Sequence, residues 1–108
     1  MMKIFVIGSY FDTDTKKTEF NITRAKQAGI EILKKGHLPF VPQPMFASWE
    51  TEVDKTAIMK ACFDWIGECD AVLILNLGKE GGGTSRALEQ AKNLHKVVFN
   101  SVAEIPQV

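Results

Sequence analysis

Two runs of apolar residues constrain the fold of this chain more than any other feature. KIFVIG (3–8) and AVLILNL (71–77) are almost continuous in apolar side chains instead of alternating with polar ones. This pattern is typical of strands that are covered on both faces within a parallel sheet. Parallel strands are joined by long crossovers, which are usually helical. The two runs therefore predict helices elsewhere in the chain.

Amphipathic segments occupy the positions where such helices are needed. The first helix should span residues 14–35, with Ile22, Ala25, Gly29, Ile32 and Leu33 at helical spacing. The second should span 51–67, with Ile58, Cys62, Trp65 and Ile66 on one face and Thr51 and Asp54 at capping-box spacing. A third should follow the glycines at 81–83, with Leu88, Ala91 and Leu94 facing inward.

Two further short strands are expected, at 38–41 and 96–99, and the prolines around the first restrict it to a sheet edge. The alternation of strands and helices predicts one α/β domain spanning residues 1–108. Its architecture should be a three-layer, doubly wound, flavodoxin- or Rossmann-like parallel sheet of four to five strands. Ligands bind such sheets beyond the carboxyl ends of the strands, so the loops at 9–14 and 77–85 should face each other across a site.

The composition narrows the class of ligand. Thirteen basic residues balance thirteen acidic ones, which argues against a duplex nucleic-acid partner and favours a small molecule. No segment predicts a membrane span or a signal peptide, and Cys62 and Cys69 are expected to be free thiols in a reducing cytoplasm. The spacing of His37 and His95 predicts no metal site, solvated or capping histidines are the default, and no cofactor is expected.

Glycines and hydroxyl groups in the two loops are the candidate ligand-binding residues. Glycines let backbone N–H groups approach an anion at a helix N-terminus, and serine, threonine and tyrosine add hydroxyl donors. The alternative is an ordinary strand-to-helix connection with Thr84 or Ser85 as a helix N-cap. The candidates are Gly8, Ser9, Tyr10, Gly81, Gly82, Gly83, Thr84 and Ser85.

The segment HLPFVPQPMFASW (37–49) should form a stiff wall rich in proline and aromatic residues. We expect Phe40 to pack in the core. Phe46 and Trp49 are candidates for stacking on a nucleobase, an interaction worth about 1–3 kcal/mol per base.

Three stretches together resemble the nucleoside 2-deoxyribosyltransferase superfamily. They are KIFVIGSYF (3–11), the long helix running into KKGHLPFVP (34–42), and WIGECDAVLILNLGKEGGGTSRALEQAKNLHKVV (65–98). The resemblance points to its small members of unassigned function and to the 2'-deoxynucleoside 5'-phosphate N-hydrolases. It implies a doubly wound domain, dimeric or larger, that cleaves the N-glycosidic bond of a deoxynucleoside or of its phosphate.

The resemblance also assigns residues. Asp70 matches the aspartate that assists catalysis in the family, and Ser9 matches a serine that contacts phosphate. The nucleophilic glutamate of the family falls on Ala87, and Glu89 lies two residues further on. Two residues turn a helix by about 200°, so Glu89 faces away from position 87 unless the glycine turn is longer here. Phe5 stands where several members have a tyrosine.

Three hypotheses for function follow. In the first, the chain binds a nucleotide or deoxynucleoside and cleaves or transfers at the N-glycosidic bond, with Asp70 and Glu89 as catalytic residues. In the second, it is a non-catalytic sensor or interaction module that kept the fold and lost the nucleophile. A flavodoxin-like carrier of FMN ranks last, because no convincing phosphate loop follows the first strand.

Overall fold

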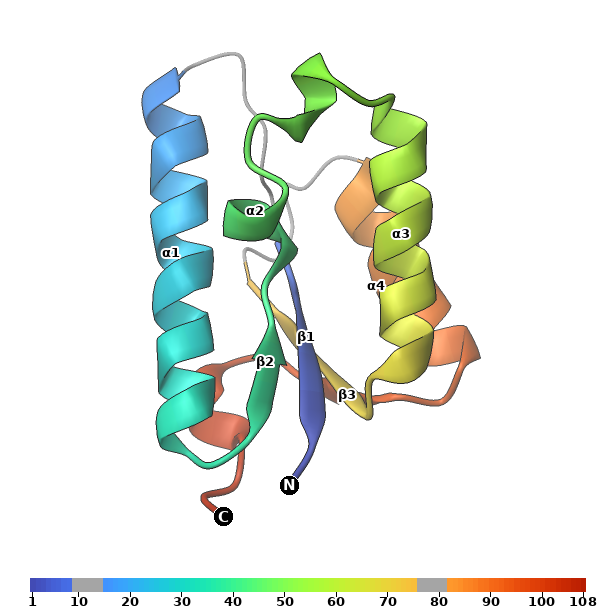
Figure 1. Cartoon of the computed structure of the whole chain (residues 1–108). Coiled ribbons are helices and arrows are strands. Elements are labelled where there is room, and N and C mark those ends of the chain that lie inside the picture. The colour runs from blue at the N-terminus through green and yellow to red at the C-terminus, as the bar shows by residue number, and fades with distance from the viewer. Residues whose placement is uncertain (9–14, 76–81) are drawn as a thin grey trace.

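A computed structural model describes residues 1–8, 15–75 and 82–108, which form a parallel four-stranded sheet between helices (Figure 1). The strand order is β2-β1-β3-β4, and each neighbouring pair is parallel. This confirms the predicted α/β class and parallel sheet. The strands are β1 (Lys3–Ile7), β2 (Leu38–Phe40), β3 (Ala71–Ile74) and β4 (Val97–Phe99). The α-helices are α1 (Thr15–Lys34), α2 (Pro42–Met45), α3 (Lys55–Glu68) and α4 (Gly82–Asn93), and the 3-10 helices are η1 (Trp49–Thr51) and η2 (Val102–Glu104).

Each face of the sheet has its own apolar core, because β1 and β3 send alternate side chains to opposite sides. On one side, Ile4 and Val6 pack with α1 and with Ile105, next to η2. On the other, Phe5 and Ile7 pack with α3 and α4. Helices thus cover both faces of the two central strands (Figure 1), which explains why their sequences are continuously apolar.

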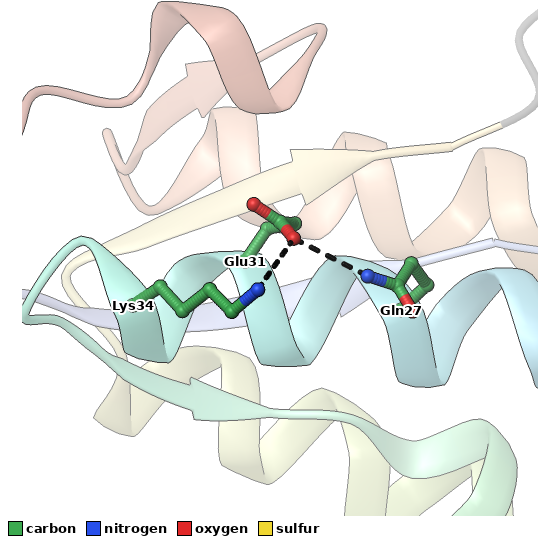
Figure 2. Close-up of polar contacts among 3 residues, drawn as sticks. All are labelled: Gln27, Glu31 and Lys34. Atoms are coloured by element: carbon green, nitrogen blue, oxygen red, sulfur yellow. Dashed lines mark hydrogen bonds and ion pairs between the residues drawn. The ribbon is translucent and has the colours of Figure 1, made fainter.

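The outer surface of α1 carries polar pairs at helical spacing. Gln27 Nε2 donates to Glu31 Oε1 at 3.2 Å, and Lys34 Nζ lies 3.6 Å from the same oxygen (Figure 2). Exposed pairs of this kind contribute about 0.2–0.5 kcal/mol each. The position of α1 therefore depends on its buried face, where Ala25 and Ile32 are almost fully covered.

The C-terminal segment is attached to the end of α1 and the start of β2. Lys35 Nζ donates to the Ile105 carbonyl at 2.7 Å. The buried His37 accepts a hydrogen bond from the Met2 backbone N–H on Nδ1 at 3.0 Å, which leaves Nε2 to donate to the Pro106 carbonyl at 2.6 Å. The expectation of a solvated or capping histidine is thus wrong at position 37, because the C-terminal segment covers the ring.

The second long helix begins later than its sequence pattern predicts. It starts at Lys55 with Asp54 as its N-cap, the Asp54 carboxylate accepting from Thr56 N–H at 2.9 Å. This bond lowers the pKa of Asp54. Thr51 instead ends η1 and donates its hydroxyl to the Ser48 carbonyl. The local cap at Asp54 therefore overrides the earlier signal at Thr51.

Leu94 does not face inward. α4 ends at Asn93, and the Leu94 side chain is 42% exposed just beyond it. The chain there turns through His95, whose φ of +57° is left-handed, with Lys96 N–H donating back to the Ala91 carbonyl. This helix-ending turn removes Leu94 from the helical face that its spacing predicted.

Candidate functional site at the carboxyl edge of the sheet

The sheet reverses its winding between β1 and β3. The chain leaves β1 for α1 on one face and leaves β3 for α4 on the other (Figure 1). Ile7 and Ile74 lie opposite each other, and Leu75 N–H donates to the Ile7 carbonyl at 2.8 Å. Crevices at such switch points are the usual ligand sites of open parallel sheets.

Gly8 is the predicted ligand-binding residue that the structure places at this point. A side chain there would meet Leu75, just beyond the end of β3, since a Cβ on Gly8 would lie 3.2 Å from the Leu75 Cβ. The same position would lie 3.6 Å from Nε2 of Gln43. Gly8 therefore lies where the ends of β1 and β3 meet α2, and it has no side chain to fill the space between them.

The other predicted ligand-binding residues are only partly described. Ser9, Tyr10 and Gly81 lie outside the described residues. Gly82 and Gly83 begin α4, with Thr84 and Ser85 in its first turn, and of these four only the helical backbone is described. The predicted third helix is therefore present beyond the carboxyl end of β3, but it begins at Gly82, inside the glycine run and not after it. Free N–H groups at a helix start favour anions.

Gln43 is a buried polar residue of this edge that the sequence analysis did not identify. Its Nε2 donates to the carbonyls of Gly8 at 3.1 Å and Val6 at 3.4 Å. Its signal in the sequence is weak, a single amide among the prolines of VPQPM (41–45). The role of Gln43 can be recognised only from the structure. There β2 ends at Phe40, which leaves carbonyls of β1 without strand partners.

Asp70 lies at the opposite edge of the sheet. It precedes β3, where its Oδ2 accepts from Lys3 N–H at 2.8 Å and its own N–H donates to the Lys3 carbonyl at 2.8 Å. These two bonds join the start of β1 to the start of β3. The predicted position at the amino end of the strand is confirmed, and the structure does not bring Asp70 to Gly8.

Glu89 and Ala87 differ in environment, as expected for two helix positions about 200° apart. Glu89 is exposed. Ala87 is 8% exposed and packs in the core cluster of α3 and α4 with Ala91. Phe5 is buried and stacks on Phe40 with ring centroids 5.3 Å apart.

The two aromatic candidates for base stacking differ in how exposed they are. Phe46 is buried and makes an edge-to-face contact with Trp49 at 4.8 Å, whereas Trp49 is 46% exposed. Phe40 stacks on Trp65 at 4.5 Å, which confirms its predicted packing role. Only Trp49 of the two stacking candidates therefore offers a substantial free surface.

Neither thiol is electrostatically activated. Burial raises the pKa of Cys62 to about 11, and burial together with the Asp70 carboxylate raises that of Cys69. Within the described ranges, no three histidine, cysteine or acidic side chains are grouped so that they could hold a metal ion. No helix in the same ranges is long and apolar enough to cross a membrane.

Comparison with solved structures finds a protein of similar fold. The structure is similar to a 2-deoxyribosyltransferase from the psychrotolerant bacterium Bacillus psychrosaccharolyticus, with a TM-score of 0.63 and 20% sequence identity over 89% of this chain and 69% of the enzyme. That enzyme is described as a biocatalyst for the synthesis of nucleosides. No protein-family model and no curated protein matches the chain in sequence. The similarity confirms the predicted fold, which is that of a 2-deoxyribosyltransferase.

Proposed function

We propose that this protein binds a nucleoside or nucleotide at the carboxyl edge of the sheet, between the end of β1 and the start of α4. The observation that carries the proposal is the meeting of Gly8, Leu75 and Gln43 at the point where the winding reverses. The 2-deoxyribosyltransferase fold supports the ligand class, because the similar enzyme acts in nucleoside synthesis.

The two loops would divide the ligand between them. We assign the sugar or phosphate to Gly8, Ser9 and Tyr10 on one side and to the segment from Gly81 to Ser85 on the other. Glycine there leaves room for direct contact between backbone N–H groups and phosphate oxygens. The dipole of α4 would stabilise the negative charge of a phosphate at the helix N-terminus. The exposed Trp49 would supply a stacking surface for the base.

Two outcomes are possible for a bound deoxynucleoside. Cleavage or transfer at the N-glycosidic bond requires a nucleophile, for which Glu89 is the candidate. Asp70 is bonded to Lys3 at the opposite edge of the sheet and is not placed to assist it there. Binding without turnover requires no nucleophile. The transferase fold supports the first outcome, whereas the exposure of Glu89 and the burial of Ala87 support the second.

The test combines binding and chemistry. The protein is incubated separately with the four 2'-deoxynucleoside 5'-monophosphates and with the four deoxynucleosides. Binding is followed by thermal shift, base release by chromatography, and a glycosyl adduct by mass spectrometry. At least one of these compounds should raise the melting temperature. If none does and no base is released, the proposed function is wrong.

Glu89→Gln then separates the two outcomes. Loss of base release with binding retained identifies Glu89 as the nucleophile. Glu68→Gln is the matched control, because Glu68 is also an exposed helical glutamate but lies near the end of α3. Binding without release in the unmodified protein supports the non-catalytic module. Release that persists at full rate in Glu89→Gln rules out the glutamate mechanism.

A further inference from the structure

Gln43 and His37 are the two buried polar side chains among the described residues, and they differ in how fully they are bonded. Both ring nitrogens of His37 have backbone partners, at Met2 and Pro106. Gln43 is 4% exposed, and its side-chain nitrogen donates to the carbonyls of Val6 and Gly8. Its Oε1 has no hydrogen-bond donor within the part of the chain that the structure describes.

The hydrogen bonds of Gln43 determine which way its amide points. Carbonyls alternate along a strand, so those of Val6 and Gly8 both face the β2 side of β1. β2 ends at Phe40, level with Phe5, and cannot reach them. The two hydrogens on Nε2 take the place of the missing strand. Turned over, the amide would set Oε1 against two carbonyl oxygens, which is repulsive.

Among the described residues, Oε1 is therefore an acceptor with unused capacity at the proposed site. It is shielded from bulk solvent, so water at the surface does not compensate for the missing donor. A buried acceptor without a partner costs free energy, so one that a structure retains calls for an explanation such as a bound ligand or an ordered water. Gly8, whose carbonyl holds the other end of this amide, is itself part of the switch point.

We propose that Oε1 of Gln43 accepts a hydrogen bond from an uncharged donor of the bound nucleoside or nucleotide, either a sugar hydroxyl or an exocyclic amino group of the base. This inference rests on the proposed function and adds a specificity residue to it. An acceptor held in one orientation selects ligands that carry the donor, because an analogue without it leaves the oxygen unpaired.

The experiment is a cycle that changes the ligand and the protein separately. The probes are the four 2'-deoxynucleoside 5'-monophosphates, each beside its 2',3'-dideoxy analogue and, for amino-bearing bases, an analogue with hydrogen in place of the amino group. Affinities are measured for the unmodified protein and for Gln43→Met, which keeps the length of the side chain but has neither donor nor acceptor amide. Gln27→Met is the control, because Gln27 is an exposed amide on α1.

For the unmodified protein and for Gln27→Met, removing the correct donor from the ligand should weaken binding by about 10- to 100-fold. For Gln43→Met the same change should have an effect close to 1-fold, since no acceptor remains. The dideoxy and the amino-deleted analogues distinguish a sugar contact from a base contact. A merely structural role for Gln43 would weaken all ligands equally and leave the discrimination intact.

Gln43→Met also removes the bonds to β1, so a measurement on the unmodified protein covers the case in which this variant does not fold. The side-chain carbonyl carbon of Gln43 should change its NMR chemical shift on binding the parent nucleotide and not on binding the analogue that lacks the donor. Equal discrimination in Gln43→Met, or an unchanged carbonyl signal, overturns the inference while the proposed function stands. Failure of every probe and of the four deoxynucleosides to bind the unmodified protein overturns the proposed function, and this inference with it.

Discussion

Replacing His37 with alanine tests whether the buried ring joins the two ends of the chain. The ring accepts from Met2 N–H and donates to the Pro106 carbonyl, so the substitution deprives both backbone groups of their partners. Each orphaned group should cost about 1–1.5 kcal/mol, and the cavity adds to this, which gives a loss of about 2–4 kcal/mol. In a domain of this size that corresponds to a fall in Tm of about 10–20 °C.

The assay is urea unfolding at neutral pH followed by circular dichroism, with thermal scans alongside. His37→Asn should recover about half of the loss, because the asparagine amide oxygen can replace Nδ1 as the acceptor for Met2 N–H. His95→Asn is the surface control and should change stability by less than about 0.5 kcal/mol, since asparagine tolerates the left-handed conformation there. A loss below about 1 kcal/mol in His37→Ala would refute the argument.

Two further predictions concern packing and thiol chemistry. Gly29→Ala should destabilise the protein by about 1 kcal/mol, because the added Cβ would lie 2.6 Å from Val41 Cγ2 and this overpacking outweighs the helix propensity of alanine. In a Val41→Ala background, urea unfolding should instead show that Gly29→Ala raises the free energy of unfolding relative to Val41→Ala alone. Cys62, with its pKa raised to about 11 by burial, should react with iodoacetamide at pH 8 about 100-fold more slowly than an ordinary thiol, as measured by peptide mass spectrometry. Because the pKa of Cys62 is higher in the folded than in the unfolded protein, the neutral thiol favours the folded state. Its contribution to the free energy of unfolding is complete below pH 9 and is lost as the pH rises through 11. Alkylation as fast as in urea-unfolded protein would contradict the stated burial.

Most of the fold was predictable because its signals are local. The runs at KIFVIG (3–8) and AVLILNL (71–77) predict buried parallel strands, and the spacing of Ala25 and Ile32 predicts the buried face of α1. The site could be predicted only as a region. Loops after parallel strands lie at one edge of the sheet whatever their residues are, so the position of Gly8 follows from topology.

The errors occur where a distant contact or a neighbouring cap decides the outcome. Thr51 and Asp54 both carry N-cap chemistry, and only the structure shows that the helix begins after Asp54. Leu94 keeps the helical spacing of Leu88 and Ala91, yet the turn at His95 ends the helix before it. Short-range sequence patterns show which helix boundaries are favourable. Where two boundaries are similarly favourable, contacts in the folded chain decide between them.

The sequence by itself determined the class of fold, the parallel strands and the helical faces, because apolar periodicity is set by neighbours within a few residues. Only the tertiary structure decided the environments of His37, Gln43 and Asp70. Their partners lie 35 residues away or more along the chain, at Met2, Gly8 and Lys3. Hydrogen bonds of that kind exist only after the sheet has formed, since it is the ends of the strands that present the unpaired backbone groups.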